Sequence, residues 1–125
     1  MDLKVALAQM GIRMGQPDQK EAVARAMAAQ AAAQGSELLM LPELWPTGYD
    51  LDTARRLAAP LHDGPFAVMA ELARAHRLYV LGTALEANPE GLPFNTAALH
   101  GPEGDLLGVY RKIHLFPPMG EVEHM

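Results

Sequence analysis

Two ionisable side chains lie at or within strand-like segments, where they could take part in catalysis. Glu43 follows an apolar run in LLMLPELWPTGYD (Leu38–Asp50), and Lys112 lies inside the strand-like segment YRKIHLF (Tyr110–Phe116). A carboxylate at the carboxyl end of a parallel strand lies at the edge where open α/β sheets bind ligands. Partly desolvated by its apolar neighbours, Glu43 would have a raised pKa and could act as a general base. A lysine aimed inward beside it could stabilise the oxyanion of an acyl-transfer intermediate.

Each of these residues also has an ordinary interpretation. An acid in a loop is commonly solvated, and a lysine on an edge strand commonly deters aggregation. Because neighbours in a strand alternate between its faces, Arg111 and Lys112 cannot do the same job. Taken separately, the two segments leave a catalytic role and a structural role open.

Other common kinds of site are excluded. The chain contains no cysteine, so it has no disulfide and no thiolate metal site. Its five histidines show no HExxH or paired spacing, and it has no glycine-rich phosphate loop. Ser36, the only serine, lies in QGSEL at a helix end and not in a nucleophile elbow. These observations argue against a nucleotide site and a zinc site.

The composition narrows the classes of partner. The chain has 125 residues, half of them hydrophobic, and a net charge of −5, which is typical of one soluble domain with a single core. Dispersed Lys and Arg offer no surface for nucleic acid or anionic lipid. The apolar run Ala22–Ala33 falls short of the roughly 20 residues of a membrane span. With no secretory leader and no cysteine, we expect a cytoplasmic protein.

The elements that must position the two side chains begin with a strand, a helix and a second strand. A long helical crossover between short apolar strands predicts a right-handed unit with parallel pairing. The predicted elements are a strand over Leu3–Met10 bounded by Gly11 and Gly15, a helix that opens at Pro17 and ends at Gly35, and a strand over Glu37–Leu41.

The second half of the chain predicts two more helices and an antiparallel hairpin. The hairpin follows from the turn signal GPEG between two strand-like segments, so the whole sheet should be mixed. GEVEHM then follows a Pro-Pro turn with no closing helix for the far face of the sheet, which indicates a further part of the protein. The predicted elements are helices over Leu51–Ala59 and 64–77, the latter capped by Asp63, and strands over Leu78–Leu85, Phe94–His100 and Asp105–Leu115.

Four segments of the sequence, read together, resemble the nitrilase superfamily of carbon-nitrogen hydrolases. They are VALAQM, LPELWPTGY, FNTAALHGPEGDLLGVYRK and YRKIHLF. The resemblance runs from Val5 to about Glu121 in the family's order and spacing. It implies an α/β fold, a four-layer αββα sandwich. Residues 1–125 would be the amino-terminal part of that single domain, a mixed sheet with helices on one face.

The resemblance also implies a Glu-Lys-Cys triad that needs no metal or organic cofactor. The general base falls on Glu43 and the catalytic lysine on Lys112. By the same resemblance, Arg111 is structural, Asn95 keeps local structure, and the acid that positions substrate is Glu121, with Glu123 the alternative.

This sequence departs from the family in one respect, because it has no cysteine to serve as nucleophile. Our leading hypothesis is that the chain is the amino-terminal part of a hydrolase that acts on a small amide, nitrile or N-carbamoyl compound through a thioester. Such a protein would form a homo-oligomer, a dimer or larger. The alternative is a non-catalytic module that binds a small molecule or serves as a scaffold. A flavodoxin-like nucleotide binder ranks last, because no phosphate loop supports it.

Overall fold

The Ala-rich helix joins two short parallel strands in the computed structural model, which describes residues 1–11 and 16–125. Strand β1 (Val5–Leu7) pairs with β2 (Leu38–Met40), and α1 (Pro17–Ala33) crosses between them. Pro17 suits the first turn, where no N–H is needed. The predicted parallel unit is therefore confirmed. The predicted boundary at Gly15 lies outside the described residues.

The first strand is shorter and less buried than the sequence predicted. Only three residues pair with β2, although the N–H of Ala8 still donates to the Met40 carbonyl at 2.9 Å. Val5 is 40% exposed and Leu7 67% exposed. The prediction of a buried strand over residues 3–10 was wrong, because alternate side chains point to a face of the sheet that carries no helix.

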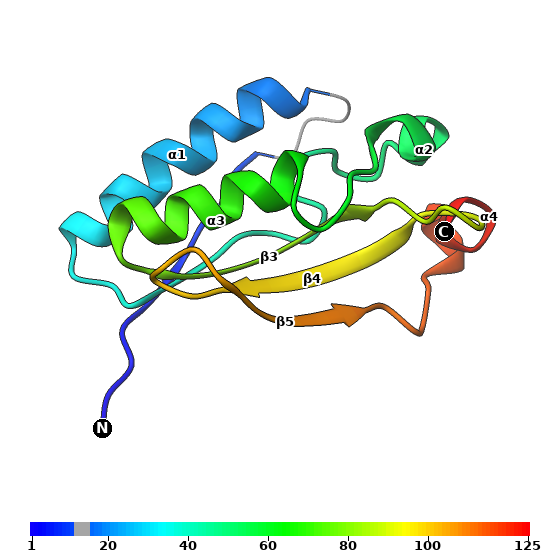
Figure 1. The fold of residues 1–125 in the computed structure, drawn as a ribbon. Coiled ribbons are helices and arrows are strands. Elements are labelled where there is room, and N and C mark those ends of the chain that lie inside the picture. The colour runs from blue at the N-terminus through cyan, green and yellow to red at the C-terminus, as the bar shows by residue number, and fades with distance from the viewer. Residues whose placement is uncertain (12–15) are drawn as a thin grey trace.

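The sheet has five strands in the order β1-β2-β3-β4-β5. Strand β3 (Tyr79–Glu86) runs parallel to β2, whereas β4 (Phe94–His100) and β5 (Leu106–Arg111) complete an antiparallel meander. The mixed sheet and its hairpin are as predicted (Figure 1). Since β5 runs in the same direction as β3, the carboxyl ends of β2, β3 and β5 meet at one edge.

Strand β5 ends four residues before the predicted boundary. The last paired residues are Thr96 and Arg111, after which the Lys112 N–H donates to the Asn95 carbonyl at 2.9 Å. Strand β4 begins directly after Pro93, which has no N–H to donate. The prediction of a strand to Leu115 was wrong, because β4 begins at Phe94, only two residues before Thr96, and could not pair with β5 as far as Leu115.

The smaller helices also differ from the prediction. The predicted helix over residues 51–59 is a 3-10 turn, η1 (Leu51–Thr53), followed by α2 (Ala54–Leu57). Asp63 precedes α3 (Gly64–His76), but its side chain makes no capping bond, and its carbonyl accepts the Phe66 N–H at 3.1 Å instead. After η2 (Pro117–Met119) comes α4 (Glu121–His124), a short helix where none was predicted.

The core lies between one face of the sheet and the two long helices, α1 and α3, which lie side by side (Figure 1). Gly82 of β3 permits this close packing, because a Cβ there would stand 2.8 Å from Met69 Sδ and 3.2 Å from Trp45 Cδ1. The largest side chains of this core with less than 2% exposure are Trp45, Phe66, Leu39, Met69 and Leu78. Leu44 and Leu85 belong to a second, smaller cluster with Leu51 and Ala54.

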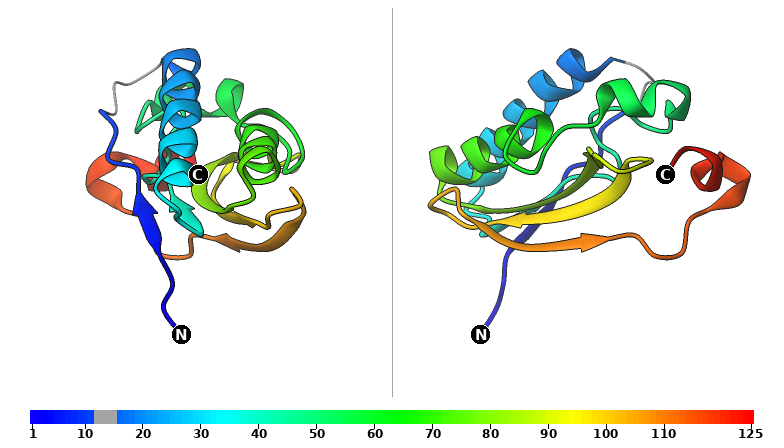
Figure 2. Two further views of the ribbon diagram at one scale, coloured as in Figure 1. Left: turned by 90° about the vertical axis from the view of Figure 1, so that its left-hand side faces the viewer. Right: turned by 45° about the vertical axis from the view of Figure 1, so that its right-hand side comes forward.

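The opposite face of the sheet carries no helix in the described part of the chain (Figure 2). Strand alternation places Leu7 and Tyr79 on this face, because Val80, next to Tyr79, points into the core. Leu7 is 67% exposed and Tyr79 42% exposed. Helix α4 lies at the end of the sheet and leaves this apolar face open. None of the helices in residues 1–11 and 16–125 has both the length and the apolar character needed to cross a membrane.

Candidate active site

Glu43 begins the turn that follows β2, and its position is fixed by the next residue. Leu44 has a positive φ of 48°, a conformation that costs of order 1–3 kcal/mol outside glycine. Two contacts hold it there. The Leu44 N–H donates to Thr83 Oγ1 at 2.6 Å, and the Leu44 side chain is fully buried. The chain therefore turns sharply and presents Glu43 at the edge of the sheet.

Lys112 meets Glu43 from the end of β5. Its Nζ lies 2.9 Å from Glu43 Oε1, although 69 residues separate the two in the chain. The same nitrogen lies 2.9 Å from Glu121 Oε2 and 3.1 Å from Glu121 Oε1. One ammonium group is thus shared by the carboxyl groups of Glu43 and Glu121.

Glu121 is the more enclosed of the two acids. It opens α4, its side chain has no exposed surface, and the Phe116 N–H donates to its Oε2. Glu123, which the sequence offered as the alternative assisting acid, is exposed and makes no contact with Lys112. The structure thus brings Glu43, Lys112 and Glu121 together and leaves Glu123 outside.

Asn95 belongs to the same cluster, a contact that the sequence did not reveal. Its Nδ2 donates to Glu43 Oε1 at 2.8 Å and to Glu121 Oε1 at 3.2 Å, and the residue is 3% exposed. We expected Asn95 only to keep local structure, yet it bridges both acids. An asparagine inside an apolar strand was the available signal, because a buried amide needs partners.

The pKa of Glu43 differs from the sequence-based expectation. Burial raises it, as predicted, but hydrogen bonds from Lys112, Asn95 and Tyr49 and the positive charge of Lys112 outweigh burial and lower the pKa below 4.5. Its side chain is still 44% exposed. The prediction of a raised pKa was therefore wrong for this chain, because it counted the apolar neighbours and missed the hydrogen-bond donors.

The partners of Glu43 shift in the complementary direction. Burial alone would lower the pKa of Lys112, but the hydrogen bonds to Glu43 and Glu121 and their charges raise it above 10.5. Burial and the hydrogen bond to Glu43 raise the pKa of Tyr49 to about 12. At neutral pH the cluster therefore holds an ionised carboxylate, a charged ammonium and a neutral phenol side by side.

Arg111 does not join this cluster. It faces the other side of the sheet, as strand alternation predicted, and binds Glu86 there. In the described residues no group of three or more His, Cys, Asp or Glu side chains is arranged to hold a metal ion.

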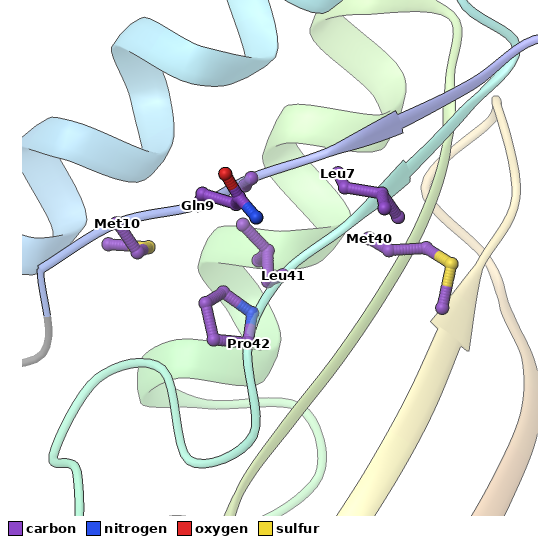
Figure 3. A pocket seen from close by; sticks show the side chains of 7 residues that line it. Leu7, Gln9, Met10, Met40, Leu41 and Pro42 are labelled. Carbon is purple, nitrogen blue, oxygen red and sulfur yellow. The ribbon is translucent and has the colours of Figure 1, made fainter.

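A pocket of about 570 Å³ lies next to the Glu43 segment, at the carboxyl ends of β1 and β2 (Figure 3). Among the described residues, its walls are apolar apart from Gln9. It is lined by Leu7, Ala8, Gln9, Met10, Met40, Leu41 and Pro42. Pro42, which lines this pocket, directly precedes Glu43.

The structure combines a mixed α/β sheet with a Glu-Lys-Glu cluster at the strand ends. Comparison with known proteins shows which family has this sequence. The sequence model of the Carbon-nitrogen hydrolase family matches residues 4–125. This chain belongs to the carbon-nitrogen hydrolase family.

Relatives and solved structures agree with this assignment. The chain is 34% identical over 118 residues to a nitrilase of Pyrococcus abyssi, which covers 91% of this chain and 44% of that protein. It is 33% identical over 87 residues to human omega-amidase NIT2, covering 70% and 32%. A carbon-nitrogen hydrolase superfamily protein from Xanthomonas campestris superposes with a TM-score of 0.88 at 25% identity, covering 99% and 45%. The chain thus spans less than half the length of these proteins.

Proposed function

We propose that this chain supplies the acid-base half of a hydrolase that acts on carbon-nitrogen bonds of small amides. The observation that carries the proposal is the position of Lys112 Nζ, 2.9 Å from Glu43 Oε1 and 2.9 Å from Glu121 Oε2. Glu43 serves as general base, Lys112 stabilises the oxyanion, and Glu121 fixes Lys112 and helps to position substrate. The named activities of relatives, omega-amidase and 2-oxoglutaramate amidase, support a small amide as substrate.

The reaction requires a thiol, which this chain does not contain. In the related amidase from Nesterenkonia, acrylamide adds to an active-site cysteine. We infer that the complete protein places a cysteine beside Glu43, from a part of the protein that follows residue 125. Residues 1–125 would then be the first part of one αββα domain, and the apolar face of the sheet would pack against the remainder. The coverage of the relatives and the exposure of Leu7 and Tyr79 support this organisation.

The proposed chemistry follows from the charges in the cluster. Glu43 takes the thiol proton as sulfur attacks the amide carbon, and the ammonium of Lys112 binds the oxyanion that forms. Protonated Glu43 then gives its proton to the leaving nitrogen, so the carbon-nitrogen bond breaks and a thioester remains. Water attacks the thioester as Glu43 takes its proton, and the carbon-sulfur bond breaks. Protonated Glu43 then returns the proton to sulfur, so the acid leaves and the thiol is restored.

The lowered pKa of Glu43 is compatible with this role. A carboxylate held ionised at neutral pH is ready to accept a proton, but it is a weaker base than one with a raised pKa. Its side chain is 44% exposed in this chain. Coverage of this surface by the remaining part of the protein would strengthen desolvation and raise the pKa of Glu43 toward the working range.

A mass measurement on the extended protein tests the proposal. The reading frame should continue into a strand followed by a cysteine, and the expressed protein should release ammonia from a small amide such as an omega-amide of a dicarboxylic acid. Rapid quenching should trap an adduct on that cysteine with the mass of the acyl group. An extended protein with no cysteine, or ammonia release that survives Cys→Ala replacement, would overturn the proposal.

The absence of cysteine from residues 1–125 also favours a second candidate, a module that binds a small molecule without chemistry. This candidate expects the 125-residue chain to be folded, soluble and monomeric by itself. Cooperative thermal unfolding of the isolated chain without self-association would favour the module. Self-association of the folded chain through the open apolar face would favour the hydrolase fragment.

A further inference from the structure

A second polar cluster lies on the helix side of the sheet, behind Lys112. Glu86, the last residue of β3, is 4% exposed. It accepts hydrogen bonds from Arg111 Nε at 2.9 Å, from Arg111 Nη2 at 2.7 Å and from Thr96 Oγ1 at 2.7 Å. The Arg111 guanidinium also lies over the Phe94 ring, 4.4 Å from its centroid. We call Glu86, Thr96 and Arg111 the rear cluster.

The rear cluster and the candidate active site are built from adjacent residues of the same strands. Asn95 precedes Thr96 in β4, and Lys112 follows Arg111 at the end of β5. Strand alternation therefore sends one residue of each pair to the site and the other to the rear cluster. Thr96 and Arg111 also face each other in the register of β4 and β5. The two clusters thus lie back to back through the sheet.

The position of Lys112 depends on how the end of β5 is held. Lys112 is the first residue beyond the strand, and one backbone bond to Asn95, at 2.9 Å, ties it to β4. Apolar packing contributes little here, because Val109 is 47% exposed and Tyr110 57% exposed. A bidentate carboxylate–guanidinium pair adds the directional restraint that packing does not supply. It connects the end of β5 to β3, across β4.

We propose that Glu86, through its bidentate pair with Arg111, is a positioning residue that sets where Lys112 lies against Glu43 and Glu121. Its relevance to catalysis rests on the proposed function, but the geometric claim stands on this chain alone. The Arg77–Glu103 pair shows the contrast. That pair has a single contact at 3.1 Å, and both side chains are at least 75% exposed. It therefore has none of the burial or bidentate geometry of the Glu86–Arg111 pair.

The proposal is tested by side-chain NMR of the extended protein, with the Glu43 carboxyl carbon and the lysine Cε observed during a pH titration. The Lys112 signal is assigned by its loss in Lys112→Met. In Glu86→Gln, we expect the Glu43 titration midpoint to rise by about one pH unit, because an opposite charge within contact distance has moved away. Only the Lys112 Cε signal should shift with it.

Glu103→Gln is the matched control, because it removes the charge of another Glu–Arg pair and should leave the Glu43 midpoint unchanged. Thr96→Val is the milder second variant, since it removes one hydrogen bond to Glu86 and keeps the ion pair. It should shift the midpoint in the same direction by less. If Glu86→Gln does not fold, Thr96→Val decides.

An unchanged Glu43 midpoint in a folded Glu86→Gln or Thr96→Val chain would overturn the proposal, even if unfolding showed a loss of stability. A merely structural pair would lower stability without moving this midpoint. Because no hydrolysis is measured, a failure of the proposed enzyme activity would leave the result intact. Equally, an unchanged Glu43 midpoint would leave the hydrolase proposal standing.

Discussion

Replacement of Lys112 by Met should destabilise the chain through Glu121 more than through Glu43. Glu121 has no exposed side-chain surface. Loss of the ammonium 2.9 Å away leaves this buried carboxylate with two partners among the described residues, Asn95 and the Phe116 N–H. Removal of one partner from a buried ion pair costs about 3–5 kcal/mol. Lys112 is itself 27% exposed, so water can enter, and we expect a loss of about 2–3 kcal/mol.

The assay is urea unfolding monitored by the fluorescence of Trp45, the only tryptophan, which is 1% exposed. In thermal unfolding of a chain of this size, the expected loss of unfolding free energy corresponds to a fall in Tm of about 8–12 °C. Arg77→Met is the control, because it breaks an exposed ion pair and should cost less than about 1 kcal/mol.

The double variant Lys112→Met, Glu121→Gln distinguishes this explanation from simple loss of packing. If the uncompensated charge of Glu121 causes the instability, its neutralisation should restore about 1–2 kcal/mol relative to Lys112→Met. A double variant less stable than Lys112→Met would refute the reasoning. So would a Lys112→Met chain as stable as the parent.

Three further outcomes follow from the same contacts. Because the pKa of Glu43 is lowered, ionised Glu43 should stabilise the fold fully above pH 4.5 and lose this effect as the pH falls through its lowered pKa. The difference in unfolding free energy between the parent chain and Glu43→Gln should therefore shrink when it is measured from pH 7 into acid. Gly82→Ala should cost about 1–3 kcal/mol by overpacking against Met69 Sδ, whereas Gly108→Ala, with no atom within 4 Å of the new Cβ, should cost far less in the same urea assay. Leu7→Lys should reduce binding of a hydrophobic dye by the isolated chain while leaving Tm nearly unchanged, because Leu7 is 67% exposed on the open face; a large fall in Tm would show that this face is packed.

The sequence predicted what depends on local pattern. The Ala-rich segment after Pro17 could only cross over as a helix, so the parallel strands followed from it. Glu43 was singled out because it follows an apolar strand-like segment, at the edge where open sheets bind ligands, and Lys112 because it is a charged residue inside such a segment. The family resemblance then joined the two.

What the sequence did not predict depends on register between distant segments. Asn95 contacts both acids because it lies opposite Lys112 across β4 and β5, which no local pattern specifies. Glu86 is the partner of Arg111 for the same reason. The lowered pKa of Glu43 could not be foreseen either, because its cause is a set of donors brought together by the fold.

The central claim, that Glu43 and Lys112 perform the chemistry, is tested most directly by steady-state hydrolysis of a small amide by the extended protein. Glu43→Gln and Lys112→Met should each lower kcat/KM by about 100-fold or more, because each removes a group that acts in the transition state. The matched controls Glu90→Gln and Lys4→Met should retain parental kcat/KM. Variants at Glu43 and Lys112 that hydrolyse the amide as fast as these controls would contradict the account.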